Sequence, residues 1–349
     1  MLNIPHRIYK AFASQSISQV RPNTGLYPAS ASIKIKDTQY GSCHRQEYYR
    51  WYRYEPTSVV DPEGVLTTTL GDSIHRMVAE LLRNNVHETD IVVLSEEQAF
   101  FDSTEFISGR IDLFLKDLKT GLLHGCDVKS VGEYKAGMVI DQPDIQHILQ
   151  CAVYLDQYNK SAKLNNSKPV QDWIVLYIAR NESWKLKKYP HGSVFKYMWQ
   201  FSIDLEKGYV TVTSQSGSRK EYPEITIEKI YEQYRILMSK IKSKTLPDRD
   251  FQIQYSEERI TGMYKSDQLN KTNGAIVEKW LEKGAKVGEL KLDIGDFQCK
   301  FCQWSALCYS ETPDAFANAK KQIQALYNIP KDIILVTELK EAKENIDLI

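Results

Sequence analysis

The chain has 349 residues, 42% of them hydrophobic, so it is long enough to bury a sizeable core as one elaborated domain or as two domains. Lys plus Arg and Asp plus Glu both total 45, which excludes a chain-wide basic field and leaves only local patches for nucleic-acid binding. No apolar run approaches the roughly 18 residues of a membrane span, and the first residues lack a secretory pattern. We therefore expect a cytoplasmic protein that does not bind membranes.

The middle of the chain predicts a helix, three strands, a second helix and a fourth strand. Residues 70–83 form the first helix, because Ile74, Val78 and Leu81 recur at helical spacing after an Asp72/Ser73 start signal. The remaining elements are expected at 91–101, 105–117 and 121–130 (strands, with a hairpin turn at 119–121), 143–158 (helix) and 172–179 (strand). This order mixes helices with strands in one stretch of the chain.

The rest of the chain is less regular. An amphipathic helix with a basic C-terminal end is expected at 225–244, and residues 246–297 are polar and weakly periodic. The predicted organisation is an N-terminal segment, a core, an insertion or lid, and a cysteine-rich end with a tail, at 1–69, 70–180, 181–297 and 298–349.

Three charged residues in two predicted strands could form a metal site. Asp112 lies among apolar residues, where a carboxylate is costly unless something compensates its charge. Asp127 and Lys129 are two residues apart in the next strand and share one of its faces. If the two strands pair, two carboxylates and an ammonium converge, and carboxylates with a backbone carbonyl such as that of Val128 suit Mg²⁺ or Mn²⁺. The alternative interpretation is an ion pair on a solvated sheet face.

The two neighbouring helices carry polar residues on faces that should point inward. His75 lies in the first helix, and its alternative role is that of an ordinary core or surface histidine. In the second helix Gln146, Gln150 and Tyr154 are spaced at i, i+4 and i+8 and share a face, which could equally be a polar exposed stripe.

In chain order these residues resemble the motifs of the PD-(D/E)XK nuclease superfamily, in its RecB-like branch. The stretches that carry the resemblance are "GDSIHRMVAELL", "GRIDLFL", "DVKS" and "HILQCAVYL". They match the branch's G-x-x-x-H, G-R-x-D, D-x-K and Q-x-x-x-Y motifs through Gly71 with His75, Gly109 and Arg110 with Asp112, Asp127 with Lys129, and Gln150 with Tyr154.

The resemblance implies an α/β fold with a restriction-endonuclease-like core, that is, a mixed central sheet flanked by helices. It also implies a role for each matched residue. His75, Asp112, Asp127 and the carbonyl of Val128 would hold Mg²⁺ or Mn²⁺, and Lys129 would be the catalytic lysine. Gln150 and Tyr154 would position the substrate or the lysine, with Gln146 as a further helper. Water activated by the metal would then attack a DNA phosphodiester in line.

A second set of residues, in "CKFCQWSALC" at 299–308, resembles a feature found in a subset of these nucleases. Members such as the AddB nuclease domain and the CRISPR-adaptation exonucleases have a lone cysteine before an aromatic and basic segment, then C-x2-C-x5-C near the C-terminal end. The matching residues are Cys43, Cys299, Cys302 and Cys308. The resemblance implies that they bind a [4Fe-4S] cluster, which we expect to act as a structural clasp.

Other interpretations of the cysteines remain open. Four thiolates can also bind Zn²⁺, although structural zinc sites typically have two close pairs rather than three ligands plus one. Cys151 lies in an apolar helix segment and is expected to be a buried thiol, and the side chain of Cys126 should point to the face of its strand opposite Asp127.

The segment "HRQEYYRWYRYEP" at 44–56 alternates arginines with aromatic residues. Arg45, Arg50, Arg53 and Trp51 could contact DNA phosphates and stack on unpaired bases. Alternatively, most of the rings pack internally around the cluster. The lysine-rich stretches at 185–196 and 240–244 are further candidates for phosphate contacts or for an ordinary solvated surface.

The charged residues and the resemblance together predict a metal-dependent DNA nuclease. The resemblance alone implies an exonuclease on single-stranded ends, in DNA recombination, repair or phage DNA processing. The expected setting is a bacterial cell or a phage-infected host. No Walker motif is present, so a helicase activity would come from a partner chain. The alternatives are a non-catalytic iron–sulfur DNA-binding subunit of a recombination complex and a regulatory iron–sulfur protein.

Overall fold

The chain forms two compact units, each of which is described by itself. The larger comprises Pro22–Tyr52 and Glu63–Pro247, and the smaller comprises Met1–Arg21, Arg53–Pro62 and Asp248–Ile349. The computed structural model describes residues 27–28, 33–35, 38–52, 54, 62–102, 104–181, 197–290, 292–300 and 302–309. In this part of the chain no helix is both long enough and apolar enough to cross a membrane.

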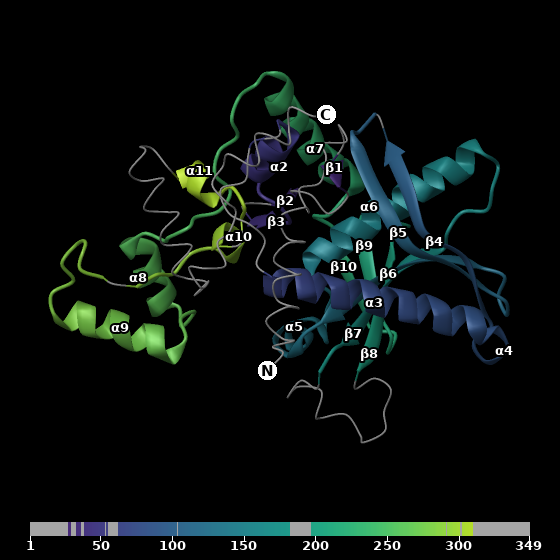
Figure 1. The fold of residues 1–349 in the computed structure, drawn as a ribbon, viewed down its shortest axis with the longest axis horizontal. Coiled ribbons are helices and arrows are strands. Elements are labelled where there is room, and N and C mark those ends of the chain that lie inside the picture. Colours follow the sequence, from purple (N-terminus) through teal and green to yellow (C-terminus); the bar gives the residue numbers. More distant parts are fainter. Residues whose placement is uncertain are drawn as a thin grey trace, which may run out of the picture. The chain divides into compact units, whose positions relative to one another are not determined.

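A mixed sheet forms the centre of the larger unit (Figure 1). Within the described ranges it has eight strands, which are β1 (Tyr27–Pro28), β4 (Ile91–Asp102), β5 (Ile107–Asp117), β6 (Leu123–Val131), β7 (Asp172–Ala179), β8 (Met198–Asp204), β9 (Val210–Ser214) and β10 (Arg219–Tyr222). The order is β1-β5-β6-β7-β8-β9-β10, with β4 also paired to β5. The pairs β1/β5 and β6/β7 are parallel and the others are antiparallel. The predicted α/β class with a mixed sheet is therefore correct.

The sheet continues beyond the end of the predicted core. Residues 198–222 were expected within an insertion or lid, but they form β8, β9 and β10 of the central sheet. The wrong prediction has a simple cause. These strands are short, and the alternation of buried and exposed side chains is their only sequence signal. In β8, Trp199, Phe201 and Ile203 are buried and the residues between them are partly exposed. The sequence boundary at residue 180 thus falls inside one folded unit.

Helices cover both faces of the sheet. They are α2 (His44–Trp51), α3 (Pro62–Asn84), α4 (Val86–Thr89), α5 (Glu133–Val139), α6 (Ile145–Leu164) and α7 (Ile227–Lys242), and a small separate sheet pairs β2 (Ile33–Ile35) with β3 (Thr38–Tyr40). Helix α3 begins well before the predicted start at Asp72 and Ser73. The Ser73 hydroxyl donates to the carbonyl of Thr69, one turn back, and so does not cap a helix end.

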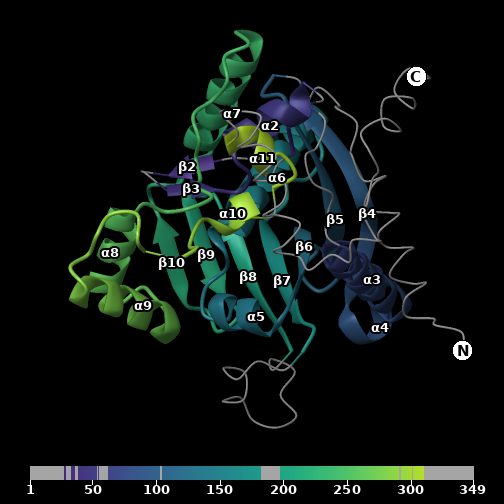
Figure 2. The same cartoon turned by 60° about the vertical axis from the view of Figure 1, so that its left-hand side comes forward.

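Helices α3 and α6 lie on opposite faces of β6 and β7 (Figures 1 and 2). On the α3 face, Val78 and Ala79 pack into one apolar cluster with Cys126, Val128 and Ile178. On the other face, the ring of Tyr154 in α6 packs against Trp173 of β7, with centroids 5.3 Å apart. Because neighbouring strand residues alternate between faces, β6 presents one set of side chains to each helix.

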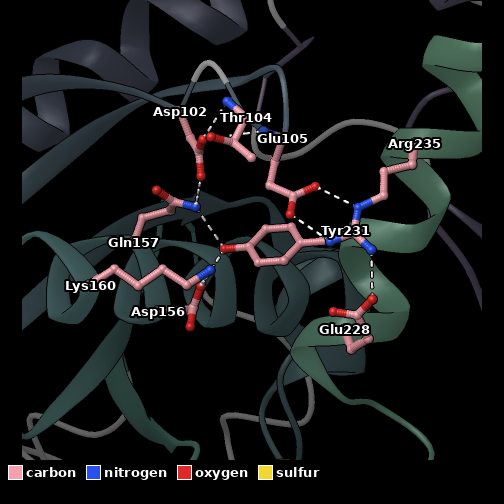
Figure 3. Close-up of polar contacts among 9 residues, drawn as sticks. All are labelled: Asp102, Thr104, Glu105, Asp156, Gln157, Lys160, Glu228, Tyr231 and Arg235. Carbon is pink, nitrogen blue, oxygen red and sulfur yellow. Dashed lines mark hydrogen bonds and ion pairs between the residues drawn. The ribbon is translucent and has the colours of Figure 1, made fainter.

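A polar network attaches α7 to α6 and to the end of the β4–β5 hairpin (Figure 3). The Gln157 amide donates to Oδ2 of Asp102 at 2.7 Å and to Oη of Tyr231 at 2.8 Å. Arg235 of α7 forms a two-point contact with the buried carboxylate of Glu105, at 2.9 and 2.6 Å. Such bidentate pairs are geometrically specific, so α7 is fixed to the end of the hairpin, and Gln157 joins α6 to both.

The smaller unit has a core of its own. Its helices are α8 (Glu257–Lys265), α9 (Lys271–Glu282), α10 (Phe297–Lys300) and α11 (Ser305–Tyr309). Ile260, Val277, Leu290 and Leu292 are buried together. Ser256 and Asn270 cap α8 and α9 by accepting from the backbone N–H groups of Arg259 and Asn273. These helices are short, which explains why the 246–297 stretch showed so little periodicity.

Replacing Gly125 by Ala should destabilise the larger unit. A Cβ at this position would lie 2.3 Å from ring carbons of Trp173, which is fully buried and has no room to move. We expect the free energy of unfolding to fall by about 2–3 kcal/mol, as in other overpacked cores. Urea unfolding followed by circular dichroism measures it.

Gly262→Ala is the matched control. This glycine is exposed in α8, and a Cβ there would meet nothing within 4 Å. Ala should therefore be neutral or stabilise by up to about 1 kcal/mol. Equal stability of the two variants would contradict the packing argument.

Candidate metal-dependent active site

The pairing of β5 with β6 brings the predicted charged residues together. The ladder runs from Lys116 opposite Leu123 to Leu113 opposite Cys126, so Asp112 and Asp127 occupy the next facing positions. Oδ2 of Asp112 accepts the backbone N–H of Val128 at 2.8 Å. Nζ of Lys129 lies 2.7 Å from Oδ2 of Asp127. Two carboxylates and one ammonium therefore meet at one place, as expected if the strands pair.

Helix α3 supplies an imidazole to this group. Nδ1 of His75 lies 3.6 Å from Oδ2 of Asp112. One turn earlier, a Cβ at Gly71 would lie 3.4 Å from the Ser130 hydroxyl, which is an ordinary packing distance. Helix α3 therefore packs against β6 at this point, and His75 lies beside Asp112.

Glu97 of β4 also belongs to the site, although the sequence motifs did not indicate it. Ligand atoms of His75, Glu97 and Asp112 all lie within 4.8 Å of one another. In the β4–β5 ladder Glu96 faces Leu113 and Gln98 faces Ile111, so Glu97 stands across from Asp112. Its carboxylate also forms an ion pair with Arg110 of the G-R-x-D motif. Only the pairing of the strands could reveal this, because "SEEQ" by itself is an ordinary polar stretch.

Helix α6 fixes the position of the lysine. Nζ of Lys129 donates to Oε1 of Gln150 at 3.1 Å, and the Gln150 amide nitrogen donates to Oη of Tyr154 at 2.8 Å. A Cβ at Gly109 would lie 2.7 Å from Cε1 of Tyr154, so only glycine permits this tyrosine to lie against β5. Gln146 donates its backbone N–H to Asp144, and among the described residues its side chain makes no hydrogen bond to the site.

The two aspartates are unequal in their electrostatics. Burial, followed by the charge of Asp127, raises the pKa of Asp112 to about 7, against the opposing effects of Lys129 and the Val128 N–H. Asp127 is almost completely buried, and among the described residues its Oδ2 has no hydrogen-bond partner in good geometry beyond the ion-pair contact with Lys129. Two buried carboxylates this close repel each other, and a divalent cation between them would remove the repulsion.

The pKa values of Lys129 and His75 are shifted in opposite directions. Burial favours a neutral Lys129, but the charges of Asp127 and Asp112 outweigh it and raise the pKa of Lys129 above its ordinary value. Burial, and then the charge of Lys129, lower the pKa of His75. The site therefore holds an ammonium and a neutral imidazole, and the latter is the form that binds metals. One nitrogen and several carboxylate oxygens form a donor set that fits Mn²⁺ or Mg²⁺.

The cysteines separate into two kinds. Cys126 and Cys151 are fully buried in the larger unit, where burial raises their pKa well above the ordinary value, and Cys126 lies on the α3 face, as predicted. In the smaller unit, burial raises the pKa of Cys299, and the charges of Cys302 and Cys308 raise it further, to about 12. The three C-terminal cysteines therefore lie near one another. Cys43 immediately precedes α2. Among the described residues only His75, Glu97 and Asp112 meet the spacing of a metal group, so the iron–sulfur cluster stays a prediction.

The aromatic and basic segment is largely used for packing. Tyr48 and Tyr49 of α2 are buried, which favours the internal role predicted for most of these rings. Arg45 donates to the carbonyl of Pro247, and Arg50 pairs with the buried Glu47. Trp51 is partly buried at the end of α2. Arg53 and the lysines at 185–196 lie outside the described residues.

Comparisons with known proteins add little to this geometry. No protein-family model matches the chain, and no curated protein does. A solved structure to which it is similar is described as "Crystal structure of SSO0001". That chain is 14% identical, and the match covers 70% of this chain and 87% of the other with a TM-score of 0.33. A score this low carries no argument about fold or function.

Asp112→Asn should stabilise the metal-free protein, with an effect that grows with pH. The folded-state pKa of Asp112 is raised to about 7, so the stability of the wild type is greatest when the group is protonated and falls as pH rises from about 4 to about 7. Asn keeps an acceptor for Val128 without the charge. At pH 8 in EDTA we expect the variant to gain about 1–2 kcal/mol, and at pH 4 almost nothing.

Thermal unfolding with and without Mn²⁺ completes the test. Mn²⁺ should raise the melting temperature of the wild type and have little effect on Asp112→Asn. Asp72→Asn removes an exposed carboxylate on α3 and should behave like the wild type in both buffers. A constant gain across the pH range would contradict the raised pKa of Asp112.

Proposed function

We propose that the protein is a metal-dependent DNA nuclease of the PD-(D/E)XK type. The observation that carries the proposal is the convergence of Asp112, Asp127 and Lys129 from two paired strands with His75 from α3. An ion pair on a solvated face would not be buried or held by a neighbouring helix, whereas here Gln150 fixes Nζ of Lys129. The mixed sheet flanked by helices is compatible with a restriction-endonuclease-like core.

Each residue has a task in phosphodiester hydrolysis. His75, Asp112, Asp127 and the Val128 carbonyl would hold Mg²⁺ or Mn²⁺, with Glu97 as a further carboxylate. A bound cation of this kind polarises a phosphate and lowers the pKa of a bound water. Because its pKa is raised, Lys129 stays an ammonium and stabilises negative charge on the phosphate rather than accepting a proton. Gln150, held by Tyr154, keeps Nζ directed to the site.

The preference for single-stranded ends and the exonuclease mode rest on the motif resemblance alone, as do the proposed roles in recombination, repair or phage DNA processing. The same resemblance supports a [4Fe-4S] cluster on Cys43, Cys299, Cys302 and Cys308. Thiolates are the ligands that such clusters require, and the three C-terminal cysteines lie within electrostatic reach of one another.

Lys129→Met should abolish cleavage of DNA without abolishing binding. The ammonium acts on charge that develops in the transition state, so we expect the cleavage rate to fall by at least about 100-fold. The assay uses end-labelled single-stranded DNA with Mn²⁺, in linear and circular forms. An exonuclease degrades the linear form only.

Lys207→Met is the matched control. Lys207 is exposed and pairs with Glu221 of β10, the edge strand of the sheet that is farthest along the strand order from β5 and β6. It should cut at the wild-type rate. Full activity of Lys129→Met would refute the site. A wild type that binds DNA but never cuts it, with Mg²⁺ or with Mn²⁺, would favour the non-catalytic DNA-binding subunit instead.

The cysteine centre should contain iron. Protein purified without oxygen should be brown and contain iron and sulfide in equal amounts, and Cys302→Ser should lose iron and melt at a lower temperature. Cys151→Ala also lowers stability, because this thiol is buried in the core, but it should keep its iron. Stoichiometric zinc without iron would overturn the cluster and favour the zinc alternative.

A further inference from the structure

A buried tyrosine stands beside the lysine of the site. Tyr177 of β7 pairs with Lys129 in the parallel β6–β7 ladder, so the two side chains leave the sheet on the same face. Its ring is fully buried and stacks on Trp199 with centroids 5.6 Å apart and planes 16° apart. Phe201 meets the same ring edge-on. The hydroxyl of Tyr177 is therefore held in one place.

The hydrogen bonds of this hydroxyl determine the tautomer of His147. Oη of Tyr177 accepts the backbone N–H of Asp144 at 3.1 Å and lies 2.7 Å from Nδ1 of His147. Among the described residues it has no other partner. A buried O–H that donated to nothing would be costly, so Tyr177 must donate to Nδ1. The proton of the neutral imidazole is consequently on Nε2.

His147 is on the site-facing side of α6, one turn before Gln150. The charged groups that act on it come from three elements: Lys129 and Asp127 from β6, Lys135 from α5, and Asp144 at the start of α6. Burial, and then the charge of Lys129, lower the pKa of His147 to about 4, so the ring is neutral at physiological pH. The side chain is only half-buried, and in the described part of the chain Nε2 has no hydrogen-bond partner.

We propose that His147 is a substrate-binding residue that donates its Nε2–H to a phosphate oxygen of single-stranded DNA at the site of Lys129. This inference rests on the proposed nuclease function and adds a specific contact to it. A neutral donor suits the position, because a second cation beside the Lys129 ammonium would be repelled by it. Tyr177, braced by Trp199, positions the imidazole and fixes its proton without touching the DNA.

Two substitutions distinguish the proposed role of His147 as a hydrogen-bond donor to DNA from a role in packing alone. His147→Asn places a carboxamide near the Nδ1 position, where its oxygen can still accept from Tyr177, but it leaves no donor at Nε2. His147→Gln reaches the Nε2 position with an amide N–H but loses the acceptor for Tyr177. The control is His87→Asn, because His87 is exposed on α4.

Binding is measured by fluorescence anisotropy with a labelled single-stranded oligonucleotide and Mg²⁺, with every variant built in the Lys129→Met background to prevent cleavage. We expect His147→Asn to weaken binding about tenfold, equivalent to one hydrogen bond to a charged group, and His147→Gln to remain within about threefold. Melting temperatures should follow the opposite order, with His147→Gln the lower.

If His147 only packs, affinity should follow stability and His147→Gln should bind worse than His147→Asn, which would overturn the inference. Unchanged affinity of both variants, or a background protein that binds no DNA, would overturn it as well. The outcome is independent of catalysis. If only His147→Asn loses binding, the contact is supported even when the wild type cuts no DNA. The absence of cleavage would refute the nuclease proposal but not the contact.

Discussion

The repulsion between the buried carboxylates of Asp112 and Asp127 is the constraint on which the site depends. Both are held by the β5–β6 pairing, and neither can turn away from the other without breaking the Val128 hydrogen bond or the Lys129 ion pair. Burial makes each charge more costly, and the raised pKa of Asp112 is the direct consequence. A folded core that concentrates negative charge in this way gives up stability, and a cation bound between the carboxylates would remove the repulsion.

Glycines in β5 and β6 let large aromatic side chains pack close to the two aspartates. Gly109 lets Tyr154 lie against β5, and Gly125 lets Trp173 lie against β6. Each removes a side chain at a point where a helix or a neighbouring strand must come near the charged residues. The site is consequently assembled by packing distances as much as by its ionisable groups.

Sequence patterns predicted the parts of this arrangement that depend on local periodicity. The four strands at 91–101, 105–117, 121–130 and 172–179 and the helices around 143–158 and 225–244 are found, with shifted ends. The largest shift is in α6, which continues to Leu164. The same patterns placed Asp127 and Lys129 on one strand face, because alternation is a local property. They could not predict Glu97 or Tyr177, which reach the site only through strand pairing, nor β8 to β10, whose short alternating runs resemble an exposed insertion.

Helix α6 shows how a single element connects packing to chemistry. Toward α7 it is fixed by the contacts of Gln157 and Asp156 with Tyr231, and toward the sheet by Tyr154 against Trp173. In the turns before these anchors, α6 carries His147, which is hydrogen-bonded to Tyr177, and Gln150, which is hydrogen-bonded to Lys129. Side chains that are fixed in this way lose little conformational freedom when a ligand binds. The rigidity of α6 thus places two neutral polar groups around one ammonium, an arrangement suited to binding an anion beside a metal without adding further charge.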